Sequence, residues 1–183
     1  MALEVMPTEL PDVLLLKPQL FSDARGFFFE SYNTRAFVAA IGLDVKFVQD
    51  NQSRSAQHVL RGLHYQLPPA AQGKLVRVIS GEIFDVAVDL RQSSPTFGRW
   101  TGQALSAENR LQIWIPAGFA HGFLTVSESA EVLYKTTDYY DPACERTLSW
   151  NDPELQIAWP LQEKPLLSPK DNQGAQFNMA EKF

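Results

Sequence analysis

The stretch RLQIWIPAGFAHGFLTV, residues 110–126, decides the fold. Its two apolar runs lie on either side of a Pro-Ala-Gly corner, and each run is short. Short apolar runs that are bounded by proline and glycine are typical of β-strands rather than of helices. The stretch therefore predicts two strands joined at a tight turn.

Similar strand patterns recur along the chain. The run KLVRVI (74–79) is followed by a Ser-Gly turn signal and by EIFDVAVDL (82–90), which together predict a hairpin. The second run alternates apolar residues with acidic ones, and one interpretation of Asp85 and Asp89 is a solvated face of the strand.

The segment EVLYKTTDYYD (131–141) alternates in the same way, with Tyr134, Thr136 and Asp138 on one face. Strands that recur with turn signals between them favour a sandwich or a barrel. We therefore predict a mainly β fold, a jelly-roll barrel with a few short peripheral helices. The length suits a single domain over residues 1–183.

Three other segments complete this prediction. Residues 22–26 read as a turn between two strands, and residues 27–29 are all Phe, which suits an interface strand or the core equally well. One short helix is expected, with Thr34 as its cap and Gly42 as its stop. The Pro-rich tail after Trp150 is expected to be irregular and to wrap over the barrel.

Composition and charge narrow the function classes. The chain has 183 residues, 45% of them hydrophobic, and its 16 basic and 21 acidic residues give a net charge of -5, which argues against nucleic-acid binding. The single cysteine, Cys144, cannot form an internal disulfide and suits a reducing compartment. No secretory segment and no apolar run of about 18 residues is present. We expect a cytoplasmic protein that does not bind a membrane.

The three histidines, His58, His64 and His121, limit the search for catalytic chemistry. We interpret His58 as a solvated loop residue. His121 ends the P-x-G-x-x-H pattern that Pro116 and Gly118 begin, which is the pattern of the second cupin motif. Its imidazole could also be a buried structural group of the barrel wall that bonds to a carboxylate such as Asp85.

The segment that corresponds to the first cupin motif lacks the metal ligands. Metal cupins carry H-x-H-x(3,4)-E-x(6)-G, whereas this chain has His64-Tyr65-Gln66, a longer insert, Lys74 and then Gly81. An ammonium group has no lone pair to give and repels a divalent ion, and an amide is a poor substitute for the second imidazole. We therefore predict no metal and no cofactor.

What remains is a base, His64, beside a fixed cation, Lys74. This pairing suits removal of a proton next to a carbonyl group, because the cation can hold the enolate oxygen as its charge develops.

Nine runs over roughly residues 10–175 form a recognisable series. In order, they are FSDARGFFFESYN, FVQDNQS, VLRGLHYQ, QGKLVRVISGEIFDVAVDLR, SPTFG, IPAGFAHGF, YKTTDYYDP, WNDP and SPKD. These runs resemble the dTDP-4-dehydrorhamnose 3,5-epimerase family, the metal-independent cupins of dTDP-L-rhamnose synthesis. The resemblance implies an isomerase that acts on carbons 3 and 5 of a dTDP-4-keto-6-deoxy sugar.

The resemblance also implies catalytic roles. His64, oriented by Asp171, removes the protons at C3 and C5, and Lys74 holds the enolate oxygen at C4. Tyr134 returns a proton on the opposite face of the ring, as inversion requires. The meeting of His64 with Asp171 rests on the resemblance alone, because the two residues lie 107 positions apart.

The substrate-binding set comes from the same resemblance. Arg25 and Arg61 are expected to clamp the pyrophosphate, with Lys170 assisting. Arg25, Phe28 and Glu30 would reach the site from the other subunit of a homodimer. The remaining expected contacts with the nucleotide and the sugar are Phe21, Gln49, Asn51, Lys74, His121 and Tyr140.

Three other functions stay open at this point. A mono-epimerase at C3 or C5, or a ketoisomerase of a dTDP-deoxysugar pathway, would share the base and the fold. A metal cupin such as a dioxygenase would need tightly held metal. A non-catalytic sugar-binding jelly roll would use the same aromatic and basic residues without reaction.

Overall fold

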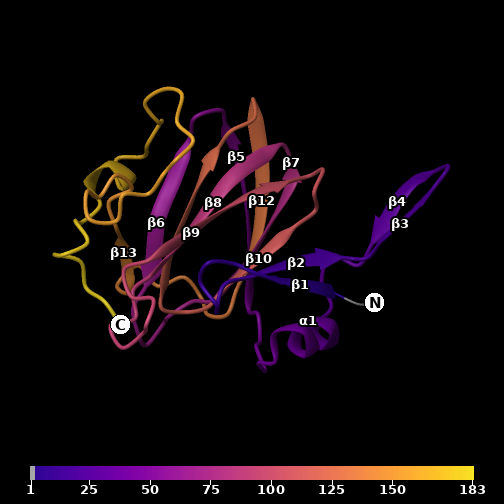
Figure 1. Ribbon diagram of the computed structural model, residues 1–183, viewed down its shortest axis with the longest axis horizontal. Coiled ribbons are helices and arrows are strands. Elements are labelled where there is room, and N and C mark those ends of the chain that lie inside the picture. The colour runs from indigo at the N-terminus through magenta and orange to yellow at the C-terminus, as the bar shows by residue number, and fades with distance from the viewer. Residues whose placement is uncertain (1–2) are drawn as a thin grey trace.

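The computed structural model describes residues 3–183 and consists mainly of strands, as predicted (Figure 1). Over this range it has thirteen strands, one α-helix and one 3-10 helix. In chain order these are β1 (Leu3–Pro7), β2 (Leu14–Pro18), β3 (Leu20–Asp23), β4 (Gly26–Phe29), α1 (Thr34–Ile41), β5 (Gln49–Ala56), β6 (Leu60–Gln66), β7 (Lys74–Ser80), β8 (Glu82–Asp89), β9 (Trp100–Ser106), β10 (Gln112–Ile115), β11 (Phe119–Thr125), β12 (Ser129–Thr136), β13 (Glu145–Thr147) and η1 (Asp171–Gln173).

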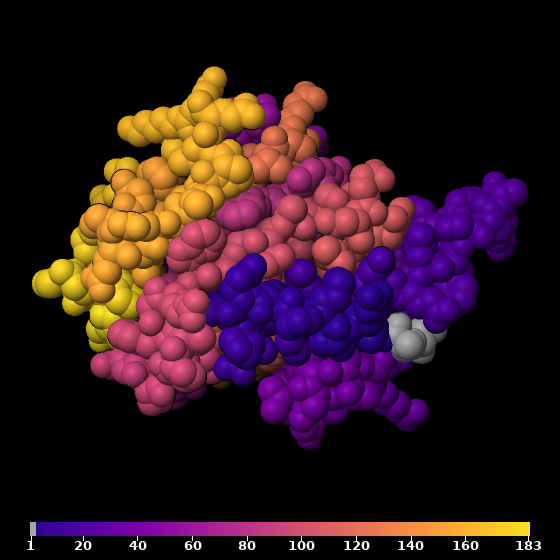
Figure 2. All heavy atoms as spheres, viewed as in Figure 1, coloured from indigo at the N-terminus to yellow at the C-terminus, as the bar shows by residue number. Residues whose placement is uncertain are grey.

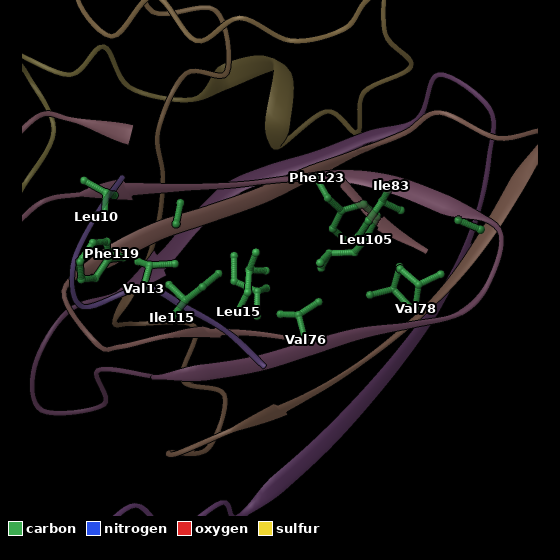
Figure 3. Close-up of a cluster of buried hydrophobic side chains, with 14 residues drawn as sticks. Leu10, Val13, Leu15, Val76, Val78, Ile83, Leu105, Ile115, Phe119 and Phe123 are labelled. Atoms are coloured by element: carbon green, nitrogen blue, oxygen red, sulfur yellow. The ribbon is translucent and has the colours of Figure 1, made fainter. Parts of the chain in front are cut away.

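Two antiparallel sheets form the body of the described chain. One has the strand order β1-β2-β10-β7-β12-β5 and the other has the order β13-β6-β11-β8-β9. Figure 3 shows side chains of both sheets, such as Val76 of β7 and Ile83 of β8, in the space between the ribbons. Burying an aliphatic side chain of this size stabilises a fold by roughly 1.5–3 kcal/mol. This shared core holds the two sheets face to face in the predicted jelly-roll arrangement.

The prediction that residues 74–79 and 82–90 form a hairpin is wrong. β7 pairs with β10 and β12, whereas β8 pairs with β9 and β11 in the other sheet. Gly81 turns the chain from one sheet to the other with a φ of +75°, and a Cβ there would lie 2.0 Å from the Ser129 carbonyl oxygen. The Ser-Gly signal marks a turn correctly, but it does not tell whether the next strand pairs with the previous one.

The interpretation of Asp85 and Asp89 as a solvated face of β8 is also wrong, since both are 0% exposed, and Asp85 instead bonds to His121. The alternation itself is present. Val86 and Val88 pack in a cluster under the C-terminal segment, and Asp85 shares the inner face of the strand with residues of the core between the sheets. Asp89 is held by Arg91 at the end of the strand.

The one α-helix of the described chain, α1, is capped by the residue before the predicted one. The cap is Asn33, whose side-chain oxygen accepts the Ala36 N–H at 3.1 Å, and Thr34 is the first helical residue. Gly42 ends the helix in the left-handed conformation, as predicted. Phe37 is buried and meets Trp114 edge to face with 5.4 Å between ring centres.

The strands β3 and β4 form the predicted hairpin, which we call the arm. The arm stands clear of the body at the right of Figures 1 and 2. The guanidinium of Arg110 lies 4.6 Å from the ring centre of Phe27, on the side of the arm that faces the body. Phe27 and Phe28 are nevertheless 59% and 62% exposed, so the run of three Phe residues is not core.

The tail after Trp150 is mostly irregular, as predicted, and covers the outer face of the five-stranded sheet. Leu155 and Phe177 of the tail pack there against Leu63 and Val88. No helix within residues 3–183 is long and apolar enough to cross a membrane.

The crossing at Gly81 generates a stability prediction. Gly81 and Gly42 have nearly the same φ, +75° and +72°, but a Cβ at Gly42 would meet nothing within 4 Å. Alanine at either site carries a strain of about 1–2 kcal/mol, and Gly81→Ala adds a clash with the backbone of β12. We expect Gly42→Ala to lower the Tm by about 2–8 °C and Gly81→Ala to lower it at least twice as much, measured by circular dichroism. Equal losses would contradict the crossing geometry.

Candidate active site

A cavity lies between the two sheets and is lined by polar side chains from both. It consists of two adjoining hollows of about 230 and 340 Å³, which share the side chains of His64, Lys74, Tyr134, Tyr140 and Glu145. We call it the His64 cavity. Its other lining residues are Gln49, Asn51, Tyr65, Gln66 and Gln72 in the first hollow, and Ser53, Arg61, His121, Phe123, Ser168, Lys170 and Asp171 in the second.

His64 and Asp171 are in direct contact despite their separation in the chain. His64 lies near the middle of β6, whereas Asp171 begins η1, and His64 Nε2 lies 2.5 Å from Asp171 Oδ1. The other carboxylate oxygen accepts the Ser168 hydroxyl at 2.7 Å. Because a carboxylate accepts the proton on Nε2, Nδ1 is the imidazole nitrogen left to act as a base.

The surroundings of this pair favour a neutral imidazole next to an ionised carboxyl group. Burial lowers the pKa of His64, and the hydrogen bond and charge of Asp171 offset this only in part. Burial alone would raise the pKa of Asp171, but the hydrogen bonds from His64 and Ser168 outweigh it and hold that pKa below its usual range. His64 can therefore accept a proton near neutral pH.

Lys74 places a cation beside this base. Its side chain is 8% exposed, and Nζ donates to the His64 carbonyl oxygen at 3.2 Å. Burial lowers the pKa of Lys74 to about 8, against the opposing charges of Asp85 and Glu145. The ammonium form still predominates at neutral pH, and the group can give up a proton more readily than an exposed lysine.

Tyr134 approaches the cavity from the other sheet than His64. It lies on β12 of the six-stranded sheet, whereas His64 lies on β6 of the five-stranded sheet, and both line the same two hollows. Burial raises the pKa of Tyr134, and the charges of Arg61 and Lys170 oppose this rise. The phenol therefore keeps its proton. The positive charges of Arg61 and Lys170 make it easier for the phenol to give that proton to a bound anion.

A chain of polar contacts marks the exposed side of the cavity. Lys170 Nζ lies 2.7 Å from Glu145 Oε1, and the Tyr140 hydroxyl donates to the other oxygen of Glu145 at 3.1 Å. Burial raises the pKa of Glu145, but the bonds from Lys170 and Tyr140 outweigh it and lower that pKa. Glu145 was not predicted to be a site residue, because no spacing or motif around it distinguishes it from an ordinary surface carboxylate.

Three of the expected substrate contacts are polar side chains on two strands that follow each other in the chain and belong to different sheets. Gln49 and Asn51 lie on β5, and the Gln49 amide donates to Asn51 Oδ1 at 2.9 Å while its oxygen accepts the backbone N–H of Tyr140 at 3.1 Å. Arg61 lies on β6 and is anchored by its bond to the Ser55 hydroxyl at 2.9 Å. All three thus belong to the cavity, with their side chains partly fixed.

His121 satisfies both of the interpretations that the sequence left open. Its Nε2 lies 2.8 Å from Asp85 Oδ2, so it is a buried histidine bonded to a carboxylate, and it also lines the His64 cavity.

Four other expected contacts lie outside the cavity of their own chain. Phe21, Arg25 and Phe28 are on the arm, and Glu30 directly follows β4, where it accepts a bond from the Asn33 side chain.

Gln66, at the position where a metal cupin would carry its second histidine, holds two loops in place through hydrogen bonds to the backbone. The Gln66 amide nitrogen donates to the carbonyls of Ala70 and Tyr139, and its oxygen accepts the Asp141 N–H. Within residues 3–183 no group of three or more His, Cys, Asp and Glu side chains is arranged to hold a metal ion.

Taken together, the cavity has a neutral base on one wall, a proton-bearing phenol from the other sheet, and an ammonium group close to both. An arrangement of this kind can remove a proton from one face of a bound ring and return one to the other face, while the cation neutralises the charge formed between the two steps.

Comparison with known proteins agrees with the chemistry that the cavity suggests. Residues 7–179 match the family described as dTDP-4-dehydrorhamnose 3,5-epimerase. A protein of that name from Pseudomonas aeruginosa is 66% identical over 174 residues, which covers 95% of this chain and 96% of the relative.

Two solved structures are informative. The dTDP-6-deoxy-D-glucose-3,5-epimerase of Legionella pneumophila, in complex with dTDP-4-keto-L-rhamnose, has a TM-score of 0.95 at 48% identity and covers 98% of this chain and 95% of its own. A 3'-monoepimerase from Streptomyces bikiniensis in complex with dTDP-quinovose has a TM-score of 0.88 at 35% identity, with coverage of 94% and 87%. The fold is thus similar to enzymes of both kinds.

Proposed function

This chain belongs to the dTDP-4-dehydrorhamnose 3,5-epimerase family, and we propose that it inverts C3 and C5 of dTDP-4-dehydro-6-deoxy-D-glucose to give dTDP-4-dehydro-L-rhamnose. It is accordingly an isomerase. One observation carries the proposal for its mechanism: His64 and Tyr134 come from different sheets and line one cavity together with Lys74. The product-type ligand in the Legionella relative supports the choice of substrate.

The first step is removal of a proton by His64. The C3 and C5 hydrogens both flank the C4 ketone, and in the gluco-configured ring both are axial on the same face, so one base can reach both. His64 Nδ1 takes the proton, and Asp171 stabilises the imidazolium through Nε2. The electron pair of the broken C–H bond moves to the C4 oxygen, where the Lys74 ammonium neutralises the enolate.

The second step is return of a proton on the other face. Tyr134 gives its phenolic proton to the carbon of the enolate, the ketone re-forms, and the configuration of that carbon is inverted. The phenolate that remains is stabilised by the nearby charges of Arg61 and Lys170 until it regains a proton from water. The imidazolium of His64 loses its proton to solvent before the second carbon reacts.

The remaining cavity residues suit the nucleotide diphosphate. Arg61 and Lys170 provide cations for the pyrophosphate, and the ring of Tyr140, 55% exposed, offers a face on which thymine can stack. Gln49 and Asn51 can bond to polar edges of the ligand. We further propose that residues 1–183 act as one cytoplasmic catalytic domain without a cofactor, and the lysine at the metal-cupin carboxylate position supports the last point.

Replacing the phenol separates the two steps. We expect Tyr134→Phe to lower net inversion by roughly 10²–10⁴-fold, because the acid on the far face is lost, while deuterium from heavy water still enters the recovered substrate at C3 and C5 through His64. NMR of the recovered sugar measures both rates. His64→Asn is the control and should lose exchange and inversion alike. Equal losses of exchange and inversion in Tyr134→Phe would contradict the opposite-face role.

The same experiment addresses the alternative functions. Deuterium at one carbon only, in the wild-type enzyme, would make this chain a mono-epimerase, to which the Streptomyces structure lends weight. Unchanged ligand binding together with no exchange at either carbon would favour a non-catalytic sugar-binding protein.

We also propose that the enzyme is a homodimer in which the arm of one subunit completes the cavity of the other. The arm is a two-stranded hairpin with exposed Phe side chains, and such a hairpin is marginal without a surface to pack on. The guanidinium of Arg25 lies 2.5 Å from Asp23 at the arm's tip and outside the His64 cavity of its own chain.

Mixing two impaired variants tests this arrangement. Arg25→Ala and His64→Asn are each expected to be strongly impaired, but a hybrid dimer regains one complete site if Arg25 acts across the interface. Random mixing should then restore about a quarter of wild-type turnover. Mixing His64→Asn with Asp171→Asn is the matched control and should restore nothing, because those two residues meet within one chain. No recovery in the first mixture would contradict the proposal.

A further inference from the structure

A second histidine–carboxylate pair lies beside the first. His121 of β11 and His64 of β6 are directly opposite each other across the strands, and each bonds to an aspartate through Nε2. The partner of His121 is Asp85 on the inner face of β8, 2.8 Å away. The mechanism proposed above assigns no role to Asp85.

Asp85 is unusual among the buried groups of the described chain. It is 0% exposed, and its Oδ1 has no hydrogen-bond partner within residues 3–183. Burying a carboxylate oxygen without a partner is costly, and a group of this kind calls for an explanation, of which a role at a functional site is one. Its position beside the His64 cavity, bonded to a histidine that lines that cavity, points to such a role.

We propose that Asp85 is a positioning residue of the epimerase reaction. Through Oδ2 it fixes the His121 tautomer so that Nδ1 is the nitrogen offered to substrate, and its buried negative charge stabilises the ammonium group of Lys74. The inference rests on the proposed function, since it concerns the same cavity.

The effect on His121 follows from hydrogen-bond chemistry. An ionised carboxylate only accepts, so the Nε2 atom that faces Asp85 must carry the proton of a neutral ring. The Nδ1 atom then has a free lone pair and can accept a bond from a sugar hydroxyl. His121 lines the cavity, so this acceptor lies within reach of a bound ligand.

The effect on Lys74 follows from the charges around it. The titratable and charged groups that line the same hollow are Arg61, His64, His121, Tyr134, Tyr140, Glu145, Lys170 and Asp171, and the charge of Asp85 on β8 also acts on Lys74. Burial lowers the pKa of Lys74 to about 8, Asp85 is the stronger of the two carboxylates that oppose this, and Lys170 acts in the same direction as burial. Glu145 is already paired with Lys170, whereas no cationic lysine or arginine is bonded to Asp85 within the described residues.

Asp85→Asn tests the kinetic consequence, because the amide keeps the shape and removes the charge. We expect kcat at pH 7.5 to fall at least tenfold with KM within about threefold of wild type, and the basic limb of the kcat–pH profile to move about one unit lower. Asp89→Asn is the matched control: Asp89 is equally buried on the same strand, but it is bonded to Arg91, Ser94 and Thr96, away from the cavity. It should cost stability and leave the pH profile unchanged. The same profile in Asp85→Asn and wild type would overturn the proposal.

A second measurement uses the wild-type protein without substrate, so it does not depend on whether the Asp85→Asn variant folds. NMR of the ligand-free wild-type protein with labelled histidine and lysine reports the His121 tautomer and the Lys74 titration directly. We expect neutral His121 to carry its proton on Nε2 and Lys74 to titrate near pH 8, and lower where Asp85→Asn is folded. A proton on Nδ1 of neutral His121 would overturn the proposal.

The two proposals fail in different ways. If the wild-type enzyme does not exchange C3 or C5 protons, the proposed function fails while the NMR result still stands. If exchange occurs but Asp85→Asn leaves the pH profile and the Lys74 titration unchanged, the role of Asp85 alone is wrong.

Discussion

The packing of two β-sheets face to face is the constraint on which the site depends. Side chains alternate along a strand, so every second residue of β6 and β12 points into the space between the sheets. This brings His64 and Tyr134 to one cavity from different sheets, although their strands are not paired with each other. With a base on one wall and an acid on the other, the architecture itself allows proton removal on one face of a bound ring and proton return on the opposite face.

The cavity departs from the apolar core next to it because it encloses charge. Lys74 and Asp85 are both buried, and neither is neutralised by a short ion pair with the other in the described chain. Such burial costs stability, and it also strengthens each interaction with a developing enolate because little water competes. Apolar residues at these positions would stabilise the fold more and could not hold an oxyanion.

Local signals in the sequence predicted the strands, the arm, the helix stop at Gly42 and the replacement of metal ligands by Gln66 and Lys74. They did not predict partners, because pairing is not local. The turn at Gly81 looked like a hairpin and instead crosses between sheets. The acids of β8 looked solvated because the sequence does not show that the other sheet covers this face of the strand. His64 and Asp171 were joined by family resemblance, and Glu145 had no signal at all.

A structure of the enzyme with dTDP-6-deoxy-D-glucose, which lacks the C4 ketone and cannot react, tests the central claim most directly. The account predicts the sugar ring between the two side chains, with the C3 and C5 hydrogens toward His64 Nδ1, the Tyr134 hydroxyl on the opposite face, and the C4 oxygen within about 3.5 Å of Lys74 Nζ. A ring with the imidazole and the phenol on the same face, or a ring bound outside the cavity, would contradict it.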